Sequence, residues 1–212
     1  EADPSYDVDG IDAGHKITIL SSLAYGGYIN FSEVYLQGIR DISLVDIFEA
    51  EKLGFSIKLI ASSKINEDNF VEISAEPILL KNEKLLSNVN DVYNAIEVTG
   101  SYTGKTLFYG KGAGMEPTAS AVISDIVKIA TDSVINSSFF FDTKSHLKTV
   151  DTNELKHEFY IRTSKDFNIE ASALELYMEI DNYYIIIAEN ISRNELNEIF
   201  ANVNEKLIVK II

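Results

Sequence analysis

Apolar and polar residues along the chain follow two spacings, one typical of helices and one typical of strands. A repeat of three or four residues predicts a helix, and a two-residue alternation predicts a half-buried strand. The first half of the chain has two helical segments, residues 13–24 and 43–53, and each is followed by glycine. Strand-like alternation follows in four segments: residues 55–61, 70–77, 94–99 and 106–109.

The flanking residues set the expected limits of these elements. Residues 1–12 carry five carboxylates and few apolar side chains, which predicts an acidic loop. Asp12 is the expected N-cap of the first helix, and Gly26 and Gly54 stand where helices commonly end. Residues 110–117 form a glycine-rich turn that leads into another helix. Helices followed by strands with antiparallel connections predict an α+β fold, a mixed sheet covered by helices.

The last 60 residues read as a second, smaller unit. Strands are expected over residues 157–162, 183–187 and 207–212, and helices over residues 169–178 and 194–200. This order is that of a split βαβ, ferredoxin-like domain. The expected domains are therefore residues 1–130 and 153–212, with residues 131–152 as a polar linker.

Composition excludes several classes of function. The net charge of −15 argues against a nucleic-acid surface, and the chain has no cysteine for disulfides or thiolate metal sites. The three histidines do not recur at ligand spacing, so no metal site is expected. No apolar run is long enough to span a membrane, and the chain begins without a signal peptide. A cytoplasmic protein is the expectation.

One acidic segment carries candidate chemistry. Asp12 and Lys16 are four residues apart at the start of the first helix, so their side chains should meet. A lysine held among carboxylates could supply the proton that a carbonyl oxygen gains when hydride arrives. Glu1, with the other carboxylates, could hold a substrate ammonium group. The alternative is an acidic loop followed by an ordinary surface ion pair.

Residues 1–16 resemble the signature of homoserine dehydrogenases. That signature is an acidic residue, D-P, two residues, D, an aliphatic residue, one residue, G, one residue, D, three residues and K. The matching positions in this chain are Asp3, Pro4, Asp7, Val8, Gly10, Asp12 and Lys16. A second match to the same enzymes runs from Gly110 to Asp125, through G-x-G-A-G and P-T-A-S-A-V.

The resemblance implies a role for each matched residue. Glu1, Asp7 and Asp12 would bind substrate, and Asp12 and Lys16 would be catalytic, with Lys16 as proton donor and acceptor. Gly112 and Gly114 would contact the cofactor, NADP or NAD. The implied reaction interconverts L-homoserine and L-aspartate 4-semialdehyde. A nucleotide-binding domain with the G-x-G-x-x-G turn, which this chain lacks, is expected to precede residue 1.

The C-terminal unit resembles a degenerate ACT domain. One of its usual four strands is not recognisable, and the turn at residues 164–168 has neither proline nor glycine. An amino-acid effector and a purely structural role both stay open. The alternative function is a non-catalytic, ACT-containing binding or assembly module. A homodimer through the sheet of residues 55–110 is also expected, because the apolar run at residues 78–80 reads as exposed.

Overall fold

The computed structural model describes residues 3–131, 142–168, 174, 176–180 and 182–212. These form two compact units, residues 1–81 with 140–212, and residues 82–139. The helices are α1 (Ser5–Val8), α2 (Ile11–Tyr25), α3 (Leu44–Lys52), α4 (Met115–Thr131) and α5 (Arg193–Ile199), and the 3₁₀ turns are η1 (Phe31–Glu33), η2 (Leu85–Asn88) and η4 (Thr152–Glu154). The strands are β1 (Gly27–Tyr28), β2 (Tyr35–Leu36), β3 (Phe55–Ile65), β4 (Val71–Lys81), β5 (Tyr93–Gly100), β6 (Gly104–Lys111), β7 (Asp142–His146), β8 (Lys156–Ser164), β9 (Leu176–Ile180), β10 (Tyr183–Ser192) and β11 (Lys206–Ile211).

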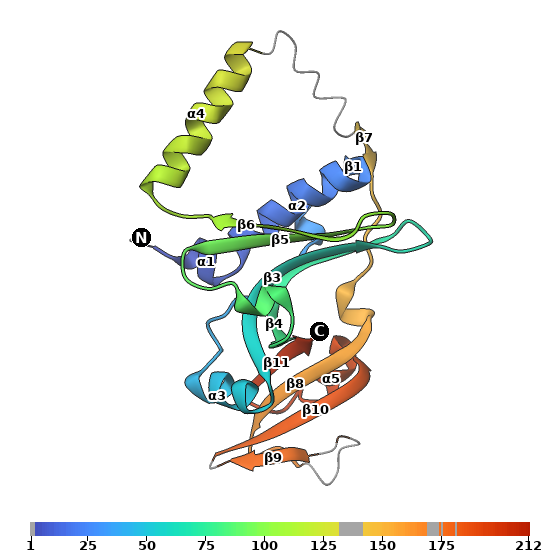
Figure 1. The fold of residues 1–212 in the computed structure, drawn as a ribbon. Coiled ribbons are helices and arrows are strands. Elements are labelled where there is room, and N and C mark those ends of the chain that lie inside the picture. Colours follow the sequence, from blue (N-terminus) through green and yellow to red (C-terminus); the bar gives the residue numbers. More distant parts are fainter. Residues whose placement is uncertain (1–2, 132–141, 169–173, 175, 181) are drawn as a thin grey trace. The chain divides into compact units, whose positions relative to one another are not determined.

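The first unit is built on one mixed sheet, which confirms the expected α+β class. Within the described part of the chain this sheet has seven strands, in the order β2-β4-β11-β8-β10-β9, with β3 also paired to β4. Strand β3 runs antiparallel along the whole of β4, while β2 and β11 pair parallel with successive parts of its other edge. Figure 1 shows β11, β8 and β10 as neighbouring strands of this sheet.

Strand β4 is an interior strand of the sheet, paired along both edges, and this corrects one expectation. Residues 78–80 were expected to be exposed at the end of a strand, but Ile78, Leu79 and Leu80 are at most 3% exposed. The strand continues to Lys81 because β3 pairs with one edge and β11 with the other. An apolar run buried between two neighbours is typical of a central strand.

The two faces of the C-terminal strands pack against different helices. On one face, Phe159, Ile161 and Ile208 pack with Leu196 and Phe200. On the other face, Tyr160, Leu207 and Val209 pack with Ala50 of α3. The alternation follows from the two-residue period of a strand. Residues from both sides of the boundary expected at 152/153 therefore share one sheet and one core.

Two further segments differ from the prediction. Residues 176–178, expected at the end of a helix, belong to β9, because this strand pairs antiparallel with β10 after a short turn. The rest of that expected helix, residues 169–173 and 175, lies outside the described residues. Residues 142–150, expected as linker, are anchored instead: β7 pairs with β1, and Val71 exchanges backbone hydrogen bonds with Lys148 and Val150.

The second unit consists of an antiparallel hairpin and a helix. The hairpin β5–β6 and the turn between its strands are as predicted, and so is the helix after the glycine-rich turn. None of the residues of α4 is buried, and its exposed apolar side chains include Val122, Ile123, Ile126 and Val127. The hairpin also exposes Ile96, Val98 and Phe108. This unit therefore presents more apolar surface than a soluble domain usually leaves uncovered.

Candidate active site

The acidic segment before α2 is more ordered than a loop. Residues 5–8 form the short helix α1, preceded by Asp3. The Asp3 carboxylate accepts hydrogen bonds from Ser5 Oγ (2.6 Å) and Ser5 N (3.0 Å), and these bonds lower the pKa of Asp3. The prediction of a loop was wrong here, because residues 5–8 form a helical turn in which the amides of Asp7 and Val8 donate hydrogen bonds to Pro4 O.

Helix α2 begins at Ile11, two residues earlier than expected. Gly10 is the N-cap, with a φ of 76°, which favours glycine. Asp12, expected as the cap, lies instead within the first turn of the helix. A carboxylate at this position interacts favourably with the positive end of the helix dipole.

Asp12 and Lys16 do meet on the surface of α2. Lys16 Nζ donates a hydrogen bond to Asp12 Oδ2, and the two side chains are 69% and 41% exposed. A surface pair of this kind contributes roughly 0.5 kcal/mol or less to stability. Its exposed ammonium and carboxylate can therefore bind and exchange protons with a ligand without loss of the fold.

Of the two other substrate-binding candidates, the structure describes Asp7 only. Asp7 lies in α1 and is exposed, two residues before the Asp9–Gly10 turn into α2. Glu1 lies outside the described residues. The structure thus brings together Asp12 and Lys16, with Asp7 on the preceding short helix.

Residues 37–40 contact the segment between α1 and α2, and sequence reasoning did not identify them as part of the site. Arg40 forms a bidentate ion pair with Asp9, with Nε–Oδ1 at 2.5 Å and Nη2–Oδ2 at 3.1 Å. These bonds lower the pKa of Asp9. The Ile39 amide also donates to Val8 O at 2.9 Å. No local signal could have identified Arg40, since it lies 31 residues from its partner.

The two cofactor-binding candidates lie in the second unit. Gly114 has a φ of 122°, a conformation that other residues rarely adopt, and it directly precedes α4. A Cβ on Gly112 would lie 1.5 Å from Asn94 Nδ2, so a larger residue there requires the exposed Asn94 side chain to move. A glycine turn that opens onto a helix N-terminus fits a phosphate group, because free backbone N–H groups point out of the helix end.

The described residues offer no group of three His, Asp or Glu side chains that could hold a metal ion. Among the helices that the structure describes, none is long and apolar enough to cross a membrane.

Comparison with known proteins places this geometry in a family. The family model for homoserine dehydrogenase matches residues 1–127. The homoserine dehydrogenase of Helicobacter pylori is 38% identical over 97% of this chain, and that of Pseudomonas aeruginosa is 46% identical over 61% of it. The chain spans 50% of the first relative's length and 30% of the second's.

Solved structures extend the likeness to the C-terminal part. A homoserine dehydrogenase from Thiobacillus denitrificans covers 100% of this chain with a TM-score of 0.81 and 28% identity. One from S. aureus, at pH 8.5, covers 100% with a TM-score of 0.72 and 32% identity. In both cases the chain accounts for 55% of the length of the solved protein. Since the family model matches more than half of the residues, the chain belongs to the homoserine dehydrogenase family.

Proposed function

We propose that this chain supplies the substrate-binding and proton-transfer residues of an NAD(P)-dependent homoserine dehydrogenase. The reaction would interconvert L-homoserine and L-aspartate 4-semialdehyde, in the cytoplasm. The observation that carries the proposal is the exposed Asp12–Lys16 pair on the first turn of α2, within the family-matched residues 1–127.

The chemistry proposed for these side chains is a proton transfer. When bound, the dinucleotide supplies the hydride that reduces the aldehyde carbon. The Lys16 ammonium gives a proton to the carbonyl oxygen, so that the C=O group becomes CH–OH, and it recovers that proton in the reverse direction. Asp12 holds the ammonium in place, and Glu1, Asp7 and Asp12 would bind the amino group of the substrate.

We propose that Gly112 and Gly114 approach the dinucleotide phosphates. The support is the positive φ of Gly114 directly before the N-terminus of α4. The exposed apolar side chains of α4 support a further domain packed against it, which the resemblance gives as the nucleotide-binding domain. Residues 1–212 alone are therefore expected to show no dehydrogenase activity.

The experiment is a comparison of two lysines in the gene product that contains this chain. Lys16→Ala should lower kcat by roughly 10² to 10⁴ for NADPH oxidation with aspartate semialdehyde. Lys156→Ala removes a lysine of comparable exposure, 54%, from a surface ion pair with Glu195 and should leave kcat unchanged. Glu1→Ala should act mainly on the KM for homoserine. If the kcat of Lys16→Ala stays within threefold of wild type, Lys16 is only a surface ion-pair partner. If the wild-type protein has no activity, the non-catalytic module is favoured.

We also propose that residues 153–212 are an ACT-like domain. The support is the strand order β11-β8-β10-β9 and the chain order β8, β9, β10, α5, β11, in which β9 supplies the strand that the sequence did not reveal. Its role would be structural, since its strands belong to the same sheet as β2, β3 and β4. A rise in melting temperature with a single added amino acid would instead identify an effector.

A homodimer through residues 55–110 is proposed as well. Strand β3 is paired only with β4 among the described strands, and the hairpin exposes apolar side chains. An isolated two-stranded hairpin is marginal in water, so it needs a partner. Ile96→Lys should shift the chain toward monomer in sedimentation velocity, whereas Thr99→Lys, on the other face of β5, should not. Equal behaviour of the two variants would exclude this face as the interface.

A further inference from the structure

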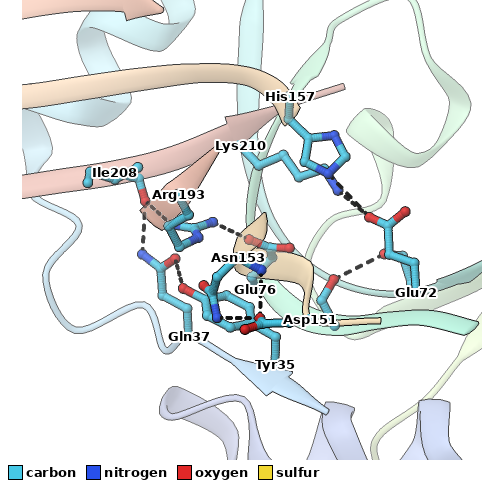
Figure 2. A network of polar contacts seen from close by, with 12 residues as sticks. Tyr35, Gln37, Glu72, Glu76, Asp151, Asn153, His157, Arg193, Ile208 and Lys210 are labelled. Carbon is cyan, nitrogen blue, oxygen red and sulfur yellow. Dashed lines mark hydrogen bonds and ion pairs between the residues drawn. The ribbon is translucent and has the colours of Figure 1, made fainter. Parts of the chain in front are cut away.

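A buried ion pair joins the C-terminal helix α5 to the central strand β4. Arg193 Nη2 donates to Glu76 Oε2 at 2.6 Å, and the two side chains are only 8% and 3% exposed. The guanidinium also lies over the rings of Tyr35 and Phe159, 4.8 Å and 5.1 Å from their centroids. Figure 2 shows Arg193 pointing toward Glu76. Because both charges are desolvated and the cation is flanked by rings, the position of Arg193 is closely defined.

Gln37 is tied to the same cluster through a backbone carbonyl. Ile208 O accepts hydrogen bonds from Gln37 Nε2 (3.1 Å) and from Arg193 Nη1 (3.3 Å). Tyr35 donates its hydroxyl to Gln37 Oε1 at 3.3 Å, so the orientation of the amide is specified at both ends (Figure 2). The Gln37 side chain therefore follows the position of β11 and α5.

The backbone of Gln37 lies against the start of α2. Gln37 N donates to Ala75 O at 3.0 Å, next to Glu76 in β4. A Cβ on Gly10 would lie 3.4 Å from Gln37 O and 3.6 Å from Ala75 O, so Gly10 packs directly on these two carbonyls. Gly10 is the N-cap of the helix whose first turn carries Asp12, followed by Lys16.

We propose that Gln37 is a positioning residue, bound at Ile208 O beside Arg193, that fixes the first turn of α2 and with it the Asp12–Lys16 pair. It contacts the C-terminal segment with its side chain and the Gly10 turn with its backbone. The C-terminal segment thereby contributes to the geometry of the active site without touching the substrate. The expected effect on catalysis rests on the proposed function, whereas the effect of Gln37 on the order of the first turn of α2 does not.

Two variants weaken this connection without leaving a buried charge unpaired. Gln37→Met keeps the length of the side chain but removes both hydrogen bonds, and Ile208 O still accepts from Arg193. Arg193→Lys keeps the charge beside Glu76 but cannot reach both partners with a planar group. The matched control is Ser62→Ala, which removes a side-chain hydrogen bond with Ser74 (3.3 Å) between β3 and β4 that does not involve Gln37 or Gly10.

The first measurement is amide hydrogen exchange of the peptide covering residues 10–16, on the 212-residue chain. Exchange should be at least about tenfold faster in Gln37→Met and Arg193→Lys than in wild type, and unchanged in Ser62→Ala. This readout is independent of activity. Exchange that stays unchanged in the first two variants, or that rises equally in all three, overturns the proposal.

The second measurement is steady-state kinetics on the gene product that contains this chain. Gln37→Met should lower kcat about tenfold, because a small displacement of a proton donor slows the chemical step, with a smaller change in the KM for NADPH. If exchange is faster in Gln37→Met but its kcat is normal, the contact of Gln37 with the start of α2 has no role in catalysis, and that part of the proposal is overturned. If wild type proves inactive while exchange responds as expected, the proposed function fails and the coupling of Gln37 to α2 stands.

Discussion

The carboxylate of Glu72 makes the stability of the sheet depend on acid pH. Glu72 accepts a hydrogen bond from Lys210 Nζ at 2.9 Å and lies 3.4 Å from His157 Nε2, with its side chain 22% exposed. His157 and Lys210 lie beside this carboxylate and lower the pKa of Glu72 from 4.5 to about 2, although burial opposes the shift. A carboxyl group with a lowered pKa stabilises the folded state above its unfolded pKa, and this contribution is lost as pH falls toward the folded pKa.

The magnitude follows from the pKa difference. At about 1.4 kcal/mol per unit, the shift corresponds to about 3 kcal/mol near pH 6 and to about 1.5 kcal/mol near pH 3. Glu72→Gln removes the titrating group. The difference in unfolding free energy between wild type and Glu72→Gln should therefore fall by about half between these two pH values.

Urea unfolding followed by far-UV circular dichroism measures this difference at each pH. Glu67→Gln is the control, because it removes the same charge from the exposed turn between β3 and β4. Its difference from wild type should stay within about 0.5 kcal/mol at both pH values, as for other surface substitutions. A Glu72→Gln difference that is as large near pH 3 as near pH 6 would refute the assignment of the acid sensitivity to Glu72.

Three further substitutions test other parts of the structure. Arg162→Met leaves the fully buried Asp46 without its cation, so the unfolding free energy should fall by about 3 to 5 kcal/mol in urea titrations. Ser192→Ala removes the oxygen that accepts from Glu195 N at 3.2 Å in the capping box of α5, and it should cost about 1 kcal/mol in the same assay. Gly114→Ala forces a Cβ into a φ of 122°, a strain of about 1 to 3 kcal/mol at the turn, and should raise the KM for NADPH more than it lowers kcat.

Elements with local signals were predictable from the sequence. Helix α3 begins after Ser43 and ends before Gly54, whose φ is 80°, and its apolar spacing is clear without any tertiary information. The hairpin β5–β6 was likewise set by two alternating segments and the turn between them. The Asp12–Lys16 contact needs only a continuous helix, so the centre of the candidate site was also predictable.

Other features depend on contacts that no local pattern encodes. The sequence favoured Asp12 as the cap of α2, since aspartate is a good capping residue. Gly10 takes that position because Gln37 O and Ala75 O lie against it, and only a residue without a side chain fits easily at its φ of 76°. Strand β9 was missed because its pairing with β10, rather than its own spacing, decides its conformation.

Buried charge is the feature that sequence reasoning handled least well. Charged residues are normally read as solvent-exposed, so no local pattern indicated that Glu76 and Arg193 are buried. In the folded chain they meet across 117 residues at the junction of β4, β11 and α5, where each satisfies the other. The same junction binds Gln37, which lies against the start of α2. A charge that is costly to bury alone can thus fix the relative position of two distant segments when its partner lies on the second one, and here one of those segments, β4, lies against Gly10 at the start of α2.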